Sequence, residues 1–310
     1  MHKHIEELLS LPSFYDDIPF LISMKNYWPI IYKVYTILSV KSICEIGSFK
    51  GDTSKFLIRE LEDNIEKFYI VDPKISEDLK LNIANNKKVL IFEEKSVEFL
   101  KRGYLIDMYL IDGDHNYTTV KKELELISNS DFKIVCLHDV SWCCADRDFY
   151  YDVSDIPKNQ KCFTNIYLNI DSNDFSDYGF YFNDMYVSKS YGKGMGVLNA
   201  VLDFITDYPD LYDFFSIPSL FGLGFLWNKQ ILTPEQIDLL ESYFESLRVI
   251  KPFLAVLEAN RLRLIQEISL RDKIIKNMES SIKNMESSIS WRITKPLRWL
   301  GERIGYKANK

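Results

Sequence analysis

The sequence is short of histidine and has no long apolar run. No segment reaches the roughly 18 apolar residues of a membrane-spanning helix, and the stretch MHKHIEELLSLPSFYDD lacks the apolar block of a secretory signal. We therefore expect a cytoplasmic chain. The net charge of −7 argues against the basic surface that general nucleic-acid binding needs, so no nucleic-acid partner is expected. With 310 residues, 46% of them hydrophobic, the chain suits one large domain plus an appendage.

Cysteine is also sparse, and no C-x-x-C pair occurs among the five cysteines. This pattern favours reduced, mostly structural thiols, two of them within apolar strand-like runs. Cys143 and Cys144 are adjacent, and a redox or metal role for this pair is the alternative.

From Ser42 onward, short apolar runs alternate with amphipathic stretches, which is typical of a parallel sheet flanked by helices. The expected strands are 42–47, 67–72, 89–94, 107–112 and 133–139. The expected helices are 53–61, 77–84, 97–101 and 117–127. An antiparallel pair, 213–219 and 221–227, would complete a doubly wound α/β sheet of seven strands.

Residues 141–194 have a different character, because they are rich in Asp, Asn and Tyr and only weakly periodic. Long irregular segments are usually functional lids or disordered linkers, and the aromatic content argues against disorder. The sequence therefore predicts a lid or substrate-covering insertion.

The turn after the first expected strand reads Glu45-Ile46-Gly47-Ser48-Phe49-Lys50-Gly51 and leads into a helix. Glycines allow a close backbone approach to a ligand, and a helix N-terminus offers free amide donors. Asp72 ends the second strand, where an acid commonly accepts bonds from ribose hydroxyls. Together they predict a nucleotide-like ligand. The alternatives are a tight structural turn and an ordinary solvated strand end.

The segment DMYLIDGDH (107–115) runs from an apolar strand into an acidic turn that ends in one of only four histidines. Charged groups at the end of a buried strand cost folding free energy, so their presence indicates a site.

Four segments, EIGSFKGDT, YIVDP, LIDGDHNYTTVKKELEL and KIVCLHDV, resemble the successive motifs of class I S-adenosylmethionine-dependent methyltransferases. The resemblance covers about residues 40–140, with weaker agreement to about 228, and implies a Rossmann-like fold. DGDH-x-Y followed by a strand ending in HD is similar to the group of macrocin and mycinamicin sugar O-methyltransferases and cephalosporin-hydroxylase-like proteins.

The resemblance implies that Glu45, Gly47 and Gly51 line the methionine part of S-adenosyl-L-methionine and that Asp72 holds its ribose. Ser96 would lie beside the adenine, although Glu94-Lys95 stands where such proteins often have Gly-Asp. The full set of implied cofactor-binding residues is Glu45, Gly47, Ser48, Phe49, Gly51, Asp72, Ser96 and Asp112.

In the metal-dependent members, acids equivalent to Asp112 and Asp139 bind Mg²⁺ and a histidine equivalent to His115 is the catalytic base. His138 replaces a second acid and is our third expected metal ligand. The alternatives are a capping or hydrogen-bonded role for His115 and packing within the strand for His138. Asp114 is expected only to cap the helix that starts near Tyr117.

These residues predict a divalent-metal-assisted O-methyltransferase that acts on a sugar hydroxyl in surface-glycan or glycosylated-metabolite biosynthesis, with Asp112 and His115 as catalytic residues. One alternative is a non-catalytic cofactor-binding or scaffold protein of a glycan assembly complex. An NAD-dependent oxidoreductase is disfavoured, because the first turn lacks G-x-G-x-x-G.

The C-terminal third predicts a helix at 234–247 and a long helix from about Phe253. The block IKNMESS occurs at 275–281 and again at 282–288, which places isoleucine and methionine at heptad positions. We expect a coiled coil and a homo-oligomer. The alternative is a lone helix packed on its own domain.

The last residues, 291–310, mix six basic residues with tryptophans around a single acid. This composition favours peripheral contact with the inner face of a membrane, and the alternative is a basic docking or disordered tail. Pro296 is expected to interrupt the helix. The expected domains are an N-terminal helical segment (1–35), a methyltransferase domain (36–230, including 141–194), a helical and coiled-coil segment (231–290) and the tail (291–310).

Overall fold

The computed structural model describes residues 23–61 and 64–303. The chain divides into two compact units. Unit 1 holds the chain up to Asn165 together with Phe182–Asn260, and unit 2 holds Ile166–Tyr181 and the chain from Arg261 onward. Much of the expected N-terminal helical segment, residues 1–22, lies outside the described residues. Its described part forms the 3-10 helix η2 (Met24–Tyr27) and the helix α2 (Trp28–Ile37).

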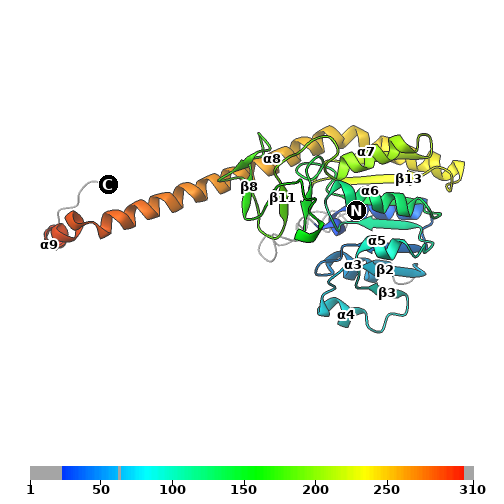
Figure 1. The fold of residues 1–310 in the computed structure, drawn as a ribbon, viewed down its shortest axis with the longest axis horizontal. Coiled ribbons are helices and arrows are strands. Elements are labelled where there is room, and N and C mark those ends of the chain that lie inside the picture. The colour runs from blue at the N-terminus through cyan, green and yellow to red at the C-terminus, as the bar shows by residue number, and fades with distance from the viewer. Residues whose placement is uncertain (1–22, 62–63, 304–310) are drawn as a thin grey trace, which may run out of the picture. The chain divides into compact units, whose positions relative to one another are not determined.

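A seven-stranded sheet forms the centre of unit 1, with the order β12-β13-β5-β4-β1-β2-β3 (Figure 1). The strands are β1 (Ser42–Ile46), β2 (Lys67–Val71), β3 (Val89–Phe92), β4 (Met108–Ile111), β5 (Ile134–His138), β12 (Tyr212–Ile217) and β13 (Leu223–Asn228). β1 to β5 pair in parallel, and β13 pairs antiparallel to both β5 and β12. The predicted doubly wound, Rossmann-like sheet with a closing antiparallel pair is confirmed.

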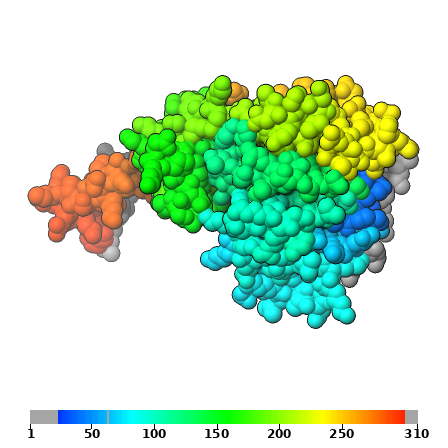
Figure 2. Space-filling model, turned by 45° about the vertical axis from the view of Figure 1, so that its right-hand side comes forward, coloured from blue at the N-terminus to red at the C-terminus, as the bar shows by residue number. Residues whose placement is uncertain are grey.

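Helices cover both faces of this sheet. They are α3 (Asp52–Leu61), α4 (Glu77–Ile83), α5 (Ser96–Leu100), α6 (Tyr117–Ile127), α7 (Val197–Asp207) and the first part of α8 (Pro234–Ser287). Alternate strand residues such as Ile70 and Cys136 join one core with α2, α3, α4 and α8. On the other face α6 packs between α5 and α7, and Figure 2 shows α6 and α7 side by side.

The strand register brings the site together, because it places the ends of three strands level. Ile46 of β1 pairs with Ile111 of β4, and Ile111 pairs with Leu137 of β5. The strand order reverses between β1 and β4, and ligands of such sheets bind in the crevice at that point. Residues that follow these three strands therefore share one edge of the sheet.

The insertion at 141–194 is more regular than its weak periodicity indicates. β6 (Phe149–Tyr150), β7 (Cys162–Phe163) and β11 (Tyr186–Ser188) form a three-stranded sheet. The 3-10 helix η3 (Val153–Asp155) lies in the connection between β6 and β7. β8 (Ile166–Leu168), β9 (Phe175–Ser176) and β10 (Phe180–Phe182) form a second one, which belongs to unit 2 except for Phe182. Strands of two or three residues are too short to show alternation in the sequence. The role of the insertion as a lid stays a prediction.

The C-terminal helices are longer than expected. The sequence predicts a helix at 234–247 and a long helix from about Phe253, whereas α8 is continuous over both ranges and includes Pro252. Phe244 and Leu254 pack on the same core, and this packing offsets the hydrogen bond that Pro252 removes. The predicted interruption at Pro296 is also wrong, because α9 (Ile289–Arg303) includes it. The break falls at Ser288 instead, whose hydroxyl accepts from the Trp291 amide at 3.2 Å.

Of the remaining expectations, the five cysteines are free thiols, and all except Cys162 are buried. Over the described ranges, no helix has both the length and the apolarity needed to cross a bilayer. The basic residues Lys307 and Lys310 of the tail lie outside the described residues, and membrane contact stays a prediction. The expected domain boundaries also stay predictions.

We predict that Gly47→Ala destabilises the protein by about 3 kcal/mol or more, because a left-handed φ costs an L-residue about 1–2 kcal/mol and the site is crowded. Gly47 has φ +87°, and an added Cβ would lie 2.3 Å from the Asp112 carbonyl oxygen. Gly103→Ala is the control, since Gly103 has φ +66° with no neighbour within 4 Å. Urea unfolding measures both, and equal losses would contradict the close approach of the two turns.

Candidate functional site

The glycine turn after β1 lies directly against the turn after β4. Gly47 N donates to Val71 O at 2.9 Å, and Asp112 N donates to Ile46 O at 2.9 Å, so backbone bonds continue past the strand ends. The missing side chain of Gly47 is what allows this approach. Gly51 has φ +77°, and an added Cβ there would lie 2.8 Å from the side chain of Leu79 on α4. Gly51 therefore has a packing role in addition to its predicted cofactor role.

Asp72 organises this turn with its carboxylate. Its Oδ2 accepts from Ser48 N at 2.8 Å, from Phe49 N at 3.0 Å and from Ser48 Oγ at 3.3 Å. Its Oδ1 accepts from Lys74 N at 2.8 Å, the one bond to this oxygen among the described residues. An ionised carboxylate offers about four acceptor sites, so Oδ1 keeps capacity for a further donor such as a hydroxyl. Phe49 has φ +46° and is exposed beside the turn.

Glu45 is buried within β1 and accepts a hydrogen bond from Ser54 Oγ at the start of α3. Burial raises the pKa of Glu45 to about 8, against the opposing effect of the Ser54 hydroxyl. Carboxylates of Asp112, Asp72 and Asp52 add to the increase. A mostly protonated Glu45 can donate as well as accept a hydrogen bond toward a ligand.

Ser96 opens α5 at the carboxyl end of β3 and is half-buried. The two residues before it, Glu94 and Lys95, both form ion pairs. Glu94 pairs with Arg102 at 2.7 Å, and Lys95 pairs with Asp155 of the insertion at 2.6 Å. The departure from Gly-Asp thus creates an ion pair between the β3–α5 turn and the insertion.

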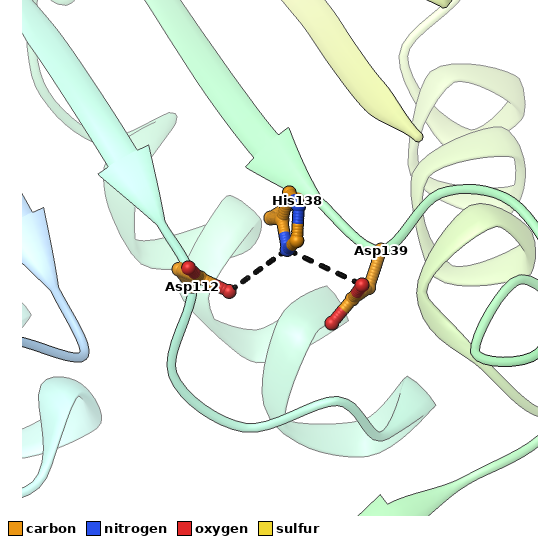
Figure 3. A group of neighbouring side chains, drawn as sticks. All are labelled: Asp112, His138 and Asp139. Atoms are coloured by element: carbon orange, nitrogen blue, oxygen red, sulfur yellow. Dashed lines mark hydrogen bonds and ion pairs between the residues drawn. The ribbon is translucent and has the colours of Figure 1, made fainter. Parts of the chain in front are cut away.

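The three predicted metal ligands form a compact group at the ends of β4 and β5 (Figure 3). His138 Nδ1 lies 3.1 Å from Asp112 Oδ1 and 3.2 Å from Asp139 Oδ1. One ligand atom from each residue lies within 4.8 Å of the others. Two carboxylates and an imidazole suit a hard or borderline divalent cation. Asp112, His138 and Asp139 therefore fit a metal site by both spacing and chemistry.

The backbone of Asp139 explains how two consecutive residues reach the same point. Asp139 has φ +61°, the left-handed conformation that aspartate tolerates better than most residues. Its Oδ1 faces His138, and its Oδ2 lies 2.9 Å from His115 Nδ1. Asp139 thereby joins the metal group to the predicted base.

The charges of the carboxylates and imidazoles in this cluster shift one another's pKa values. Burial opposes protonation of His138, but the carboxylates of Asp139 and Asp112 outweigh it and raise its pKa well above the usual value. The pKa of His115 is also raised, with Asp139 overcoming burial. The two imidazoles hold the pKa of Asp139 far below its usual range despite burial. The cluster places positive charge between carboxylates, as a bound divalent cation would do between the same oxygens.

His115 is buried and fixed by contacts from three directions. Its Nδ1 faces Asp139, and its carbonyl accepts from Phe149 N of β6 at 3.0 Å. Its Nε2 lies 3.4 Å from the hydroxyl of Tyr151. The contact with Asp139 gives the His115 side chain a partner, and its catalytic role stays a prediction. The ring of His138 meets Tyr27 edge-on at 6.0 Å, as the packing alternative expects, and its role as a metal ligand also stays a prediction.

The predicted cap of α6 is wrong. Asn116 is the N-cap residue, and its side chain accepts from Thr119 N at 2.8 Å. Asp114 instead accepts from the Thr119 hydroxyl at 3.4 Å, and burial raises its pKa. Asn and Asp are comparably good caps, so residue type does not decide between positions 114 and 116.

Two residues of the insertion were not identified from the sequence. Tyr151 appears there only as one of many tyrosines, and its contact with His115 depends on β6. Asp148 is buried and accepts from Tyr117 N and from Gly196 N, both at 2.8 Å. It also accepts from Tyr150 Oη at 3.1 Å. Asp148 therefore ties the insertion to the starts of α6 and α7. In the sequence, Asp148 is one of many acidic residues in segment 141–194, and nothing distinguishes it from the others.

Glu123 is the third residue that sequence analysis missed. It lies on α6 with its side chain fully buried. Burial raises the pKa of Glu123 to about 8, with the Ser96 side chain opposing and the Asp114 charge reinforcing the shift. Glu123 lies in the charged segment KKELEL, where an acid is usually exposed to solvent, so the sequence does not indicate its burial.

Comparisons with known proteins do not establish a family for this chain. No protein-family model and no curated protein matches the sequence. A proposed caffeoyl-CoA O-methyltransferase from Staphylococcus aureus is 16% identical, covers 73% of this chain and 90% of its own, and aligns with a TM-score of 0.39. An SAH-bound methyltransferase from Podospora anserina is 13% identical, with 64% and 76% covered and a TM-score of 0.39. A Thermotoga maritima spermidine synthase is 14% identical, with 51% and 58% covered and a TM-score of 0.26. At these values the similarities do not establish a reaction.

We predict that Glu123→Gln flattens the pH dependence of stability. The folded state keeps the Glu123 proton up to about pH 8, whereas the unfolded chain releases it near the ordinary value of 4.5. The folded state therefore binds more protons between these values, and this group lowers the unfolding free energy as pH rises, by up to about 1.4 kcal/mol per unit. Urea unfolding at pH 5.5 and pH 8 should show the variant gaining on the wild type as pH rises. Glu125→Gln on the same helix is the control, and a parallel response of both variants would contradict the assignment.

Proposed function

We propose that this chain is an S-adenosyl-L-methionine-dependent O-methyltransferase that acts on a sugar hydroxyl with the help of a divalent cation. The observation that carries the proposal is the convergence of two groups at one sheet edge. The turn of Gly47 and Asp72 lies against the turn that begins at Asp112, and Asp112 belongs to the cluster with Asp139 and His115. The sugar acceptor itself rests on the sequence resemblance.

The residues around the glycine turn suit a nucleoside with a charged amino-acid arm. Asp72 Oδ1 retains acceptor capacity for a ribose hydroxyl, and Glu45 lies behind the turn as a buried, mostly protonated acid. Gly47 keeps the turn free of side-chain bulk beside Asp112. Bound here, S-adenosyl-L-methionine would supply an electrophilic methyl group. The chain's task is to align that group with an acceptor oxygen.

The cation would be held by Asp112, Asp139 and His138, the group that meets the spacing test. Its chemistry would be to lower the pKa of an acceptor hydroxyl, which is a poor nucleophile near neutral pH. The imidazole ligand makes Mn²⁺ a suitable ion alongside the predicted Mg²⁺. Within residues 23–61 and 64–303, His138 Nε2 is buried and has no hydrogen-bond partner, so ring reorientation within the cluster breaks no bond of that atom to these residues.

His115 is placed to remove the proton from the acceptor hydroxyl. In the neutral form of His115, with Nδ1–H donated to Asp139, the Nε2 atom carries the lone pair that can accept a proton. Asp139 fixes the ring orientation, as an acid does behind a catalytic histidine. Tyr151 lies at Nε2 and marks the side from which an acceptor would approach. In the overall step His115 would accept the hydroxyl proton as the acceptor oxygen takes the methyl group, and the methyl–sulfur bond would break to leave the thioether S-adenosylhomocysteine.

The insertion would provide the acceptor side of the site. It is joined to the catalytic turn by the backbone bond between Phe149 and His115, and to the β3–α5 turn by the pair of Lys95 and Asp155. Tyr151 is half exposed, at 52%. An exposed aromatic ring beside the base offers the apolar face that a sugar ring can stack on.

We predict that the full chain binds S-adenosyl-L-methionine and not NAD in isothermal titration calorimetry. Asp72→Ala should weaken binding at least about 10-fold, since a hydrogen bond to a charged group is worth about 1.5–3 kcal/mol. Because Asp72 also holds the turn, Asp72→Asn is measured beside it and should fold normally while binding more weakly. Asp78→Asn, an exposed acid on α4, should bind as the wild type does. Binding of NAD in preference would overturn the proposal.

We predict methyl transfer to a glycan acceptor that is stimulated by Mg²⁺ or Mn²⁺. His115→Ala should lower kcat at least about 100-fold with cofactor binding retained, as for loss of a general base. Asp112→Ala should lose the metal stimulation together with turnover. Asp207→Asn, a surface acid paired with Lys121, is the control. Cofactor binding without turnover on a broad glycan panel would favour the non-catalytic alternative, and unchanged turnover in the His115 and Asp112 variants would refute the site.

A further inference from the structure

The C-terminal half of α8 (Figure 1) belongs to unit 2 and carries exposed apolar residues at regular spacing. We call this the α8 seam and define it as Ile275, Met278, Ile282 and Met285, which occupy alternate a and d positions of two heptads. Each of these side chains is 47–59% exposed. Ile268 occupies the a position one heptad before Ile275 and is 60% exposed. Four apolar side chains in regular a and d positions are the pattern of a coiled-coil interface.

The opposite face of α8 is already used by the small sheet of unit 2. Gln266 accepts from Ile170 N at 2.7 Å, and Ser269 accepts from Gly179 N at 2.9 Å. Lys273 forms an ion pair with Asp177. In the heptad phase of the seam, residues 266 and 273 are f positions and residue 269 is a b position, which lie on the outer face of a coiled coil. The chain therefore packs on the back of the helix and leaves the a and d face open.

The residues that flank the seam suit a parallel pair better than an antiparallel one. The e positions carry Glu279 and Glu286, and the g positions carry Ser281 and Ser288. In a parallel pair, e of one helix faces g of the other, so each glutamate meets a serine. In an antiparallel pair e faces e, which would bring glutamates together. Like charges in such contacts are destabilising.

We propose that two copies of this chain associate through the α8 seam as a parallel two-stranded coiled coil. A β-branched residue at a with leucine at d favours two strands. Here isoleucine occupies a, and methionine, which like leucine is not β-branched, occupies d. Arg271 occupies the d position before Ile275, is exposed and lies 3.9 Å from Glu267, so it marks where the regular seam begins. The partner is a second copy because the exact repeat of IKNMESS presents the same spacing of a and d residues to itself.

Sedimentation equilibrium of the full chain tests the association. The wild type should have twice the mass of one chain, and the double variant Ile275→Asp with Ile282→Asp should have the mass of one. The matched control, Ser280→Asp with Ser287→Asp, adds the same charge at two exposed f positions and should remain a dimer. A monomeric wild type, or a seam variant that remains dimeric, would overturn the proposal. Thermal unfolding of unit 1 should be unchanged in both variants, which separates loss of pairing from loss of folding.

Cysteine cross-linking tests the orientation. In a parallel pair the two a positions at 282 face each other, so Ile282→Cys on a Cys162→Ser background should form an interchain disulfide under mild oxidation. The other four cysteines are buried. Ser280→Cys on the same background should not cross-link, because f positions point outward. Dimers by mass without a disulfide at position 282 would refute the parallel arrangement.

Discussion

The ion network around Asp139 is the interaction on which the site depends. A carboxylate with only 12% of its side chain exposed is costly to bury unless it is paired, and here two imidazoles pair with it. The left-handed backbone at Asp139 turns its carboxylate back toward both His138 and His115. Without that conformation, the residue after β5 would leave the cluster. One aspartate thus connects the proposed metal ligands, through His138, with the proposed base, His115.

The sheet was predictable because its signals are local. β1 to β5 are apolar runs bounded by polar turns, and each was expected within two residues of its observed ends. Strand ends of a parallel sheet share one edge, so Asp112 and Asp139 could be predicted to meet. The insertion could not be predicted in the same way. Its strands have two or three residues, and Asp148 holds it through contacts with the distant residues Tyr117 and Gly196.

The parts of the site that escaped prediction depend on tertiary contacts. Tyr151 reaches His115 only because Phe149 of β6 pairs with His115, and nothing in its sequence neighbourhood indicates this. Glu123 has the spacing of a solvated helix face but is covered completely, so its charge state reverses the usual expectation. Tertiary packing also determines how far α8 extends. Packing of Phe244 and Leu254 carries α8 through Pro252, where intrinsic propensity alone predicts a break.

Chemistry and self-association are assigned to different parts of the chain. Every residue of the candidate site lies in unit 1, whereas every residue of the α8 seam lies in unit 2. No side chain of the seam is needed to complete the cluster of Asp112, His138 and Asp139. Because the two sets of residues are distinct, a variant of one can be built without touching the other. The reaction and the pairing are therefore independent hypotheses, and failure of either leaves the physical basis of the other intact.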